Sequence, residues 1–496
     1  MINDFKQLKA HNHCHQAKEM DQLPNKVLLH IFSHLSHKEI LKSARVCKKW
    51  RTLAYDSRLW KRVCLRPVYG GLQLLNLYFK SNAKWEMLIL EYSWVSSMEA
   101  LLALISARFG PSLTLMELQT DQITAPVLHE LATKCPNLQY LTLDFSSATQ
   151  LHDFADLQTF PARLHSLTIC LSENIFLEGF LRKIYSFIGT VEVLHVIGTF
   201  EKWEEDEEEV YETINISKLK SHTPNLRVLN LWGIPFVTDE HIESISSSLP
   251  HLECLSVNFC QAVNGSSLKS LLQRCKRLRS LHMEQTTLDS KAVMNACWDN
   301  SVIEELNIAA TDISSECLIY LLSRLSNLRW LRAAVLEHFT DQVSTVLEKW
   351  IQSGNCSKLA ALDLDNCDSL SEQSLIEFLN IYGEQLLGLN LGGNEKLLEQ
   401  FWNPDNGHCG RLLSESDRQN SHRSSDRLHF AEYCQNQSAG NSLGFGQASL
   451  FGQVVEIYRP AAHEMLAVAV VGNCRRRILR SGEVEFRKSR PRIRGA

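Results

Sequence analysis

Apolar residues recur along the middle of the chain in the pattern L-x-x-L-x-L, between residues 85 and 391. Successive repeats start 25 to 35 residues apart, and most intervals lie near 26. A period of this length predicts an array of units, each with a short alternating strand, a turn and a helical return segment. The repeats start at Trp85, Leu113, Leu138, Leu164, Val191, Leu226, Leu252, Leu278, Ile303, Leu328, Leu359 and Leu386.

The unit that starts at Leu252 shows how the pattern builds a repeat. Leu252, Leu255 and Val257 point to one side of a strand, and Leu268, Leu271 and Leu272 follow at helical spacing. Because the inward side chains of neighbouring units stack on one another, they predict one continuous core.

Cysteines follow the same period. The segment Cys356-x-x-Leu359-x-x-Leu362-x-Leu364-x-x-Cys367 resembles the cysteine-containing subclass of leucine-rich repeats, and Cys135 and Cys275 repeat its first half. We expect these thiols to be small buried apolar groups rather than redox sites. The resemblance implies an α/β fold, a curved leucine-rich-repeat solenoid with parallel strands on its concave face and helices on its convex face.

A different pattern precedes the array. Pro24 suits the first turn of a helix, and Leu28, Ile31, Phe32 and Leu35 form one stripe at helical spacing. Two further short helices are predicted over roughly 38–45 and 47–55. A module of about forty residues cannot bury many apolar groups by itself, so the stripe needs a partner, either the repeats or another protein.

This amino-terminal pattern resembles a known motif. It contains Leu23-Pro24, Ile31-Phe32, Leu35, Val46-Cys47-Lys48-x-Trp50-Arg51-x-Leu53-Ala54-x-Asp56 and Leu59-Trp60. Residues 22 to 63 thereby resemble the F-box, a three-helix motif that docks on the Skp-type adaptor of SCF (Skp–cullin–F-box) ubiquitin ligases. With the repeats, residues 22 to about 394 resemble the F-box/leucine-rich-repeat family of SCF substrate receptors.

The resemblance implies that this chain only binds other proteins, that other subunits support catalysis, and that the chain needs no cofactor. The adaptor would link the F-box to the cullin, and a RING subunit would recruit the ubiquitin-conjugating enzyme. Internal packing of the module is the alternative role for each predicted contact, and a repeat scaffold uncoupled from ubiquitin transfer is the alternative function. The predicted adaptor contacts are Leu23, Pro24, Leu28, Ile31, Phe32, Leu35, Val46 and Trp50.

A protein substrate is expected on the strand face of the array, because interface anchors are enriched in Trp, Tyr and Arg. Side chains two, four and six residues after each repeat start should point to this face, because side chains alternate along a strand. Packing on neighbouring repeats is the alternative role for each of them. The candidates are Tyr140, Trp232, Trp330 and Arg332, followed by His282, Asp363 and Asp365.

Composition narrows the class of protein. The 496 residues are 44% apolar and carry a net charge of -5, which favours a globular protein and gives no global attraction to nucleic acid. The fifteen cysteines form no CxxC pair, and the first twenty residues lack a signal-peptide core. The longest apolar run, Met465 to Val471, is too short to span a membrane. We expect a cytosolic or nuclear protein with reduced thiols.

The predicted domain plan has four parts: a flexible leader over 1–21, the F-box over 22–63, about twelve repeats over 64–402, and a disordered tail over 403–496. The leader holds the cluster from His11 to His15, which we expect to bind no metal. Six acidic residues, Glu204 to Glu209, predict a protruding loop, and a second loop is predicted around Trp350 to Asn355. The tail's Arg459 to Ala496 segment has a net charge of +7, so a basic localisation patch or a small extra fold remains an alternative to disorder.

Overall fold

The computed structural model describes residues 23–65, 84–91, 98–119, 123–145, 154–171, 177–198, 222–336, 343–365, 367, 370, 372–386 and 388–391. These residues fall into two compact units. One contains the described residues within 1–141 and 159–161, and the other contains those within 142–158 and 162–496. The predicted leader with its histidine cluster, the acidic block Glu204 to Glu209 and the predicted tail all lie outside the described residues.

Three short helices and a 3-10 turn form the amino-terminal module, Leu23 to Trp60. Helices α2 (Asn25–Ser33), α3 (His37–Ser43) and α4 (Lys48–Ala54) are followed by η1 (Ser57–Trp60). The predicted positions are confirmed to within a few residues. Helix α3 begins sharply because Ser36 and Glu39 form a reciprocal capping box, which satisfies backbone N–H groups at the start of the helix.

In the part of the chain that the structure describes, thirteen strands follow one another through the sheet in chain order. The first, β1 (Arg62–Leu65), lies ahead of the twelve predicted repeats and begins inside the range predicted for the F-box. Every predicted repeat start is followed by a strand two residues later. These strands are β2 (Met87–Glu91), β3 (Leu115–Gln119), β4 (Tyr140–Asp144), β5 (Ser166–Cys170), β6 (Val193–Ile197), β7 (Val228–Asn230), β8 (Cys254–Ser256), β9 (Ser280–His282), β10 (Glu305–Asn307), β11 (Trp330–Arg332), β12 (Ala361–Asp363) and β13 (Gly388–Asn390).

The strands of each unit pair in parallel and without a shift in register. From β5 to β13, equivalent positions lie opposite one another, as Leu255, Leu281 and Leu306 do on β8, β9 and β10. The residue just before each strand helps to fix this register. The carbonyl of Glu253, for example, accepts N–H bonds from both Arg279 and Ser280 of the next repeat.

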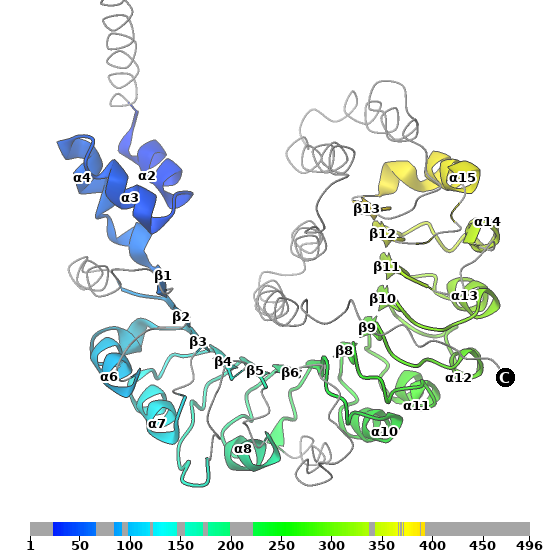
Figure 1. Ribbon diagram of the computed structural model, residues 1–496, viewed down its shortest axis with the longest axis horizontal. Coiled ribbons are helices and arrows are strands. Elements are labelled where there is room, and N and C mark those ends of the chain that lie inside the picture. The colour runs from blue at the N-terminus through cyan, green and yellow to red at the C-terminus, as the bar shows by residue number, and fades with distance from the viewer. Residues whose placement is uncertain are drawn as a thin grey trace, which may run out of the picture. The chain divides into compact units, whose positions relative to one another are not determined.

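Helices return the chain between strands. In the first unit they are α6 (Met98–Phe109) with η2 (Gly110–Ser112), and α7 (Ala125–Lys134). In the second unit the strands from β8 onward have all their connecting helices on one side (Figure 1). The helices of the second unit are α8 (Leu177–Ile184), α10 (Asp239–Ser248), α11 (Leu268–Arg274), α12 (Ser290–Met294), α13 (Ser315–Leu322), α14 (Val343–Ser353) and α15 (Glu372–Tyr382), which is followed by η3 (Gly383–Gln385).

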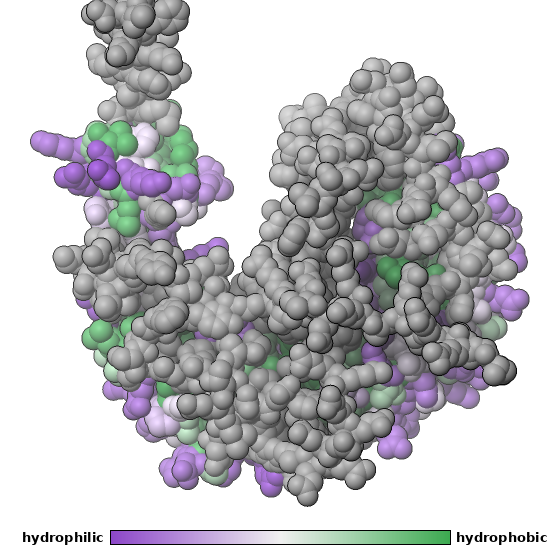
Figure 2. Space-filling model, in the orientation of Figure 1, coloured by the Kyte–Doolittle hydropathy of each residue, from purple (hydrophilic) through white to green (hydrophobic). Residues whose placement is uncertain are grey.

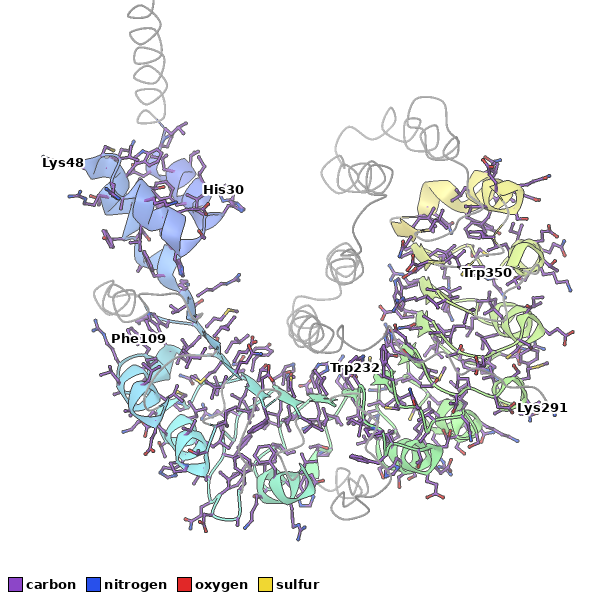
Figure 3. The ribbon with its side chains drawn as sticks, in the orientation of Figure 1. His30, Lys48, Phe109, Trp232, Lys291 and Trp350 are labelled. Atoms are coloured by element: carbon purple, nitrogen blue, oxygen red, sulfur yellow. The ribbon has the colours of Figure 1, made fainter. Side chains whose placement is uncertain are left out.

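One of these helices replaces a predicted loop. The long interval around Trp350 to Asn355 was expected to protrude, but Val343–Ser353 forms helix α14. Trp350, labelled in Figure 3, is buried and stacks on Phe378 of α15 with ring centroids 5.9 Å apart. The loop prediction is therefore wrong, because the extra residues extend a helix that the core needs.

The cysteines that fit the repeat motif are buried, as predicted. Cys135, Cys275 and Cys356 are almost inaccessible, and burial raises the pKa of the Cys356 thiol to about 12. Two cysteines that follow a strand form hydrogen bonds to the preceding repeat. The Cys260 thiol donates to the carbonyl of Leu231 at 3.0 Å, and the Cys367 thiol donates to the carbonyl of Ala333 at 3.4 Å. Within the described residues, no helix is both long and apolar enough to cross a membrane.

Candidate functional site

The amino-terminal module divides its apolar residues between a core and a surface. Leu28 and Phe32 are completely enclosed, together with Leu53 and Trp60, and the Trp60 indole N–H donates to the carbonyl of Ala54 at 2.8 Å. Leu28 and Phe32, which the sequence proposes as adaptor contacts, therefore hold the module together. This is the packing role that the sequence leaves open for them.

A row of apolar side chains lies outside this core. Pro24 is exposed, Val27 is 42% exposed, and Ile31 is half-buried, one turn farther along α2. Hydrophobic residues are visible on the surface of the module (Figure 2). Val27 is absent from the sequence prediction, although it shares the helical spacing of Pro24 and Ile31 and could have been found from it.

The other predicted adaptor contacts lie at intermediate depth or on the surface. Val46 is 59% exposed between α3 and α4, whereas Leu23, Leu35 and Trp50 are half-buried. Trp50 packs edge-to-face on Phe32 with ring centroids 5.3 Å apart, and its buried indole N–H has no hydrogen-bond partner among the described residues. We define Leu23, Pro24, Val27, Ile31 and Val46 as the apolar docking surface.

The module is joined tightly to the first strand. His37 of α3 stacks on Trp60 with ring centroids 4.7 Å apart, and its Nε2 lies 3.2 Å from the carbonyl oxygen of Leu59. Burial lowers the pKa of His37, while the Leu59 bond opposes this effect. Strand β1 begins only two residues after Trp60, and Lys61 pairs with Glu86 at 2.6 Å.

A continuous row of polar side chains follows the strands of the second unit. Each member lies four residues after a repeat start, and the parallel register places each beside the next. We call the face of β5–β13 that carries this row the strand face. The row is Thr168, His195, Asn230, Ser256, His282, Asn307, Arg332, Asp363 and Asn390.

The centre of the charged part of this row is Arg332. Its Nη1 lies 2.8 Å from Glu284 Oε2 and its Nε lies 3.0 Å from Asp363 Oδ2. Asp363 also accepts a bond from the Asn390 amide at 3.1 Å and one from the backbone N–H of Asp365. Burial raises the pKa of Asp363, and Arg332 opposes this effect. Three of the predicted substrate contacts, Arg332, Asp363 and Asp365, thus lie together, but in a network that is already hydrogen-bonded internally.

The aromatic candidates have different surroundings. Trp330 is half-buried beside His282, with ring centroids 5.6 Å apart, and Tyr140 is half-buried at the start of β4. Trp232, labelled in Figure 3, is buried against Cys170, Ile197 and Phe259. The prediction of Trp232 as an exposed anchor is therefore corrected, because β7 ends at Asn230 and the alternation of a strand no longer applies two residues later.

The chain is similar to known proteins in both of its parts. The F-box-like family matches residues 20–66. F-box/LRR-repeat protein 12 of Mus musculus is 24% identical over 308 residues, 60% of this chain and 84% of the relative. The Homo sapiens protein of the same name is 23% identical over 307 residues, with the same coverage of each chain.

Solved structures are also similar in part. A chain in the crystal structure of the Rad7 and Elc1 complex in yeast is 17% identical, with a TM-score of 0.39. The match covers 75% of this chain and 95% of that chain.

An F-box and leucine-rich repeats together support a general role as an SCF-type substrate receptor. F-box proteins bind Skp1-type adaptors, and F-box/LRR relatives are typically non-catalytic. The chain is thus similar to F-box/leucine-rich-repeat proteins, both in its amino-terminal module and in the repeats that follow.

Proposed function

We propose that this chain is the substrate-recognition subunit of an SCF E3 ubiquitin ligase that works in the cytosol or nucleus. The amino-terminal module docks on a Skp-type adaptor, which connects it to the cullin and RING subunits. The strand face of the repeats binds a protein that is to be ubiquitinated. The chain itself supplies binding surfaces and no catalytic group.

The observation that carries this proposal is the apolar docking surface. Val27 and Val46 are large hydrophobic side chains, 42% and 59% exposed, on a module whose core is already filled by Leu28, Phe32 and Trp60. Apolar anchors at successive helical turns are a common means of helix recognition by a partner protein. The residues that the internal core leaves exposed are therefore the ones available to an adaptor.

The geometry of the module also favours a fixed connection to the first strand of the sheet. The stacked His37 and Trp60 rings, the Trp60 bond to Ala54 and the immediate start of β1 leave no free linker between the helices and β1. A module held in this way keeps its docking surface fixed relative to the first strands of the repeats.

Affinity purification of the full chain from cells, with the proteasome inhibited, tests the proposal. We expect Val46→Asp, or Leu23→Ala together with Pro24→Ala, to reduce the recovered adaptor and cullin several-fold, because each change removes apolar contact area. Proteins bound to the repeats should persist in the same samples, and mass spectrometry measures both sets.

Val302→Asp is the matched control, because Val302 is a similarly exposed valine, 39% accessible, in the repeats. It should leave adaptor recovery unchanged. Equal adaptor recovery from the Val46→Asp and unmodified chains would count against the docking surface. Absence of adaptor and cullin from every sample would favour the repeat scaffold uncoupled from ubiquitin transfer.

A further inference from the structure

We propose that four residues of the strand face, Ser280, His282, Glu305 and Trp330, bind a lysine or arginine side chain of the partner protein. We call them the Glu305 cluster. The inference rests on the proposed function only in that the occupant of the strand face is a protein. It adds the chemical class of side chain that the partner presents.

The register of three neighbouring strands brings the cluster together. Glu305 of β10 lies opposite Ser280 of β9 on one side and Trp330 of β11 on the other. His282 of β9 lies beside both, because its Nε2 is 4.0 Å from Glu305 Oε2 and its ring is 5.6 Å from that of Trp330. The side chains of His282 and Glu305 remain 21% and 23% exposed, so an incoming group can reach them.

No Lys or Arg among the described residues forms an ion pair with the carboxylate of Glu305; Arg329 pairs with Glu304, and its charge acts on Glu305 only from farther away. The Glu305 carboxylate accepts one hydrogen bond, from the Ser280 hydroxyl at 2.7 Å. His282 does not supply the missing charge, because burial lowers its pKa to about 4 and leaves it neutral near pH 7. Burial also raises the pKa of Glu305, because the hydrogen bond and charges around the carboxylate do not fully replace the water that it loses.

The nearby guanidinium of Arg332 forms ion pairs with carboxylates outside the Glu305 cluster. Arg332 holds Glu284 at 2.8 Å and Asp363 at 3.0 Å. Counting Glu284, Glu305 and Asp363 against Arg332, this part of the face has two negative charges more than positive ones. An acidic segment would be repelled here, whereas a cation would reduce the desolvation cost of Glu305.

Trp330 adds a second contact for the same ligand. A Lys or Arg cation that lies over an indole face is attracted by the negative electrostatic potential of the ring. A carboxylate and an indole on adjacent strands, separated by the spacing of the sheet, can therefore contact one basic side chain together. A neutral apolar side chain would use the indole but leave the carboxylate uncompensated.

Selection from a library of random twelve-residue peptides displayed on phage tests the cluster, with the full chain and its co-purified adaptor as bait. We expect the selected peptides to contain Lys and Arg at least about threefold more often than the unselected library. A synthetic selected peptide should lose roughly tenfold in affinity when its key basic residue becomes Gln, or when the protein carries Glu305→Gln. The two changes combined should cost no more than either alone, because they remove one interaction.

Glu304→Gln is the control, since Glu304 is the preceding residue and pairs with Arg279 and Arg329 outside the cluster. It should leave peptide affinity unchanged, and thermal unfolding should show that both variants fold. Peptides without an excess of Lys or Arg, failure to select any peptide, or additive losses in the combined experiment would each overturn the proposal. Adaptor recovery from the same preparations reports separately on the SCF role, so either conclusion can fail alone.

Discussion

At the scale of the residue, the turn after the strand places one residue in the left-handed region in five consecutive repeats, those of β7 to β11. Gly233 has φ of 66°, and the equivalent residues of the next four repeats also have positive φ. The N–H of each donates to a carbonyl of the following repeat, as Val335 does to Asp365 at 2.9 Å. Glycine adopts this conformation without strain, whereas the other four carry a Cβ: Phe259, Gln285, Ala310 and Val335.

Val335 is the position where relief of this strain should be measurable. It is β-branched, 42% exposed and has φ of 51°. Burial of its side chain therefore offsets little of the energy cost of the left-handed backbone. We expect Val335→Gly to raise the free energy of unfolding by about 0.5–1 kcal/mol.

Chemical denaturation measures this change, with Val302→Gly as the control. Val302 is similarly exposed but does not have positive φ, so the same substitution should lower stability there. A loss of stability in both variants would show that the turn carries no significant strain.

At the scale of the element, charged residues join the repeats along the edge where the strands begin. One residue after the repeat start, the sign alternates through six repeats: Glu192, Arg227, Glu253, Arg279, Glu304 and Arg329. Arg227 lies 3.2 Å from Glu192 and 2.7 Å from Glu253, and Glu304 lies within 3.8 Å of both Arg279 and Arg329. We call this series the edge ladder.

The edge ladder should stabilise the array modestly and in a salt-dependent way. The hydrogen bonds that Arg227 donates to Glu253 raise the pKa of Arg227, but the Arg227 side chain is 48% exposed, so water and ions screen the pairs. We expect Arg227→Met to lower the free energy of unfolding by about 0.5–1 kcal/mol at low salt and by much less in concentrated NaCl.

Unfolding curves at two salt concentrations check this expectation. Lys291→Met is the control, because the exposed Lys291 forms no ion pair with the described residues and its loss should be nearly neutral at either concentration. A deficit for Arg227→Met that persists unchanged in concentrated salt would assign the effect to packing of its side chain instead of charge.

At the scale of the whole molecule, two histidines of the polar row link folding to pH. Burial lowers the pKa of both His195 and His282 to about 4, from 6.5 in an exposed histidine. Between these values the unfolded chain binds more protons than the folded chain, so stability rises with pH. The neutral buried histidines make their full contribution to stability above pH 6.5, the pKa of histidine in the unfolded chain. This contribution is lost as the pH falls toward about 4, their pKa in the folded chain.

His195 gives the clearest test, because its ring is buried and neither nitrogen has a hydrogen-bond partner in the part of the chain that the structure describes. We expect the protonation of His195 in the unfolded chain to make the free energy of unfolding lower at pH 5 than at pH 8 by on the order of 2 kcal/mol. Denaturation of His195→Asn across this range should show a correspondingly shallower pH dependence. His251→Asn, at an exposed position, should retain the steep one, and identical slopes for the two variants would exclude His195 as the source.

The sequence predicts the repeating part of the molecule well because one leucine pattern controls it. All twelve predicted starts precede a strand by two residues, and the buried leucines of the unit at Leu252 lie where alternation and helical spacing place them. Strand β1 was missed because its four residues, Arg62 to Leu65, lack the full pattern. Helix α14 was missed because an interval longer than the period was interpreted as a loop.

The candidate sites were predicted less completely, because burial depends on neighbours that are distant in sequence. Leu28 and Val27 are adjacent in the chain, yet the first is enclosed by the module and the second is exposed. On the strand face, Trp330 and His282 were identified by residue type, but Glu305 was not, since its significance comes from Ser280 and Trp330 on the flanking strands. Pairing between strands, and not the local pattern, defines that cluster.

The alternation of the edge ladder also restricts how such an array can change length by recombination. Loss of the single repeat that carries Glu253 would place Arg227 beside Arg279, so like charges would meet, whereas loss of that repeat and the next would restore the pair of Arg227 with Glu304. Variants that lack one repeat or two repeats, compared by melting temperature at low and high salt, would show whether an odd number of lost repeats is more destabilising than an even number. Within the ladder, the array should therefore tolerate gain or loss of repeats in twos better than in ones.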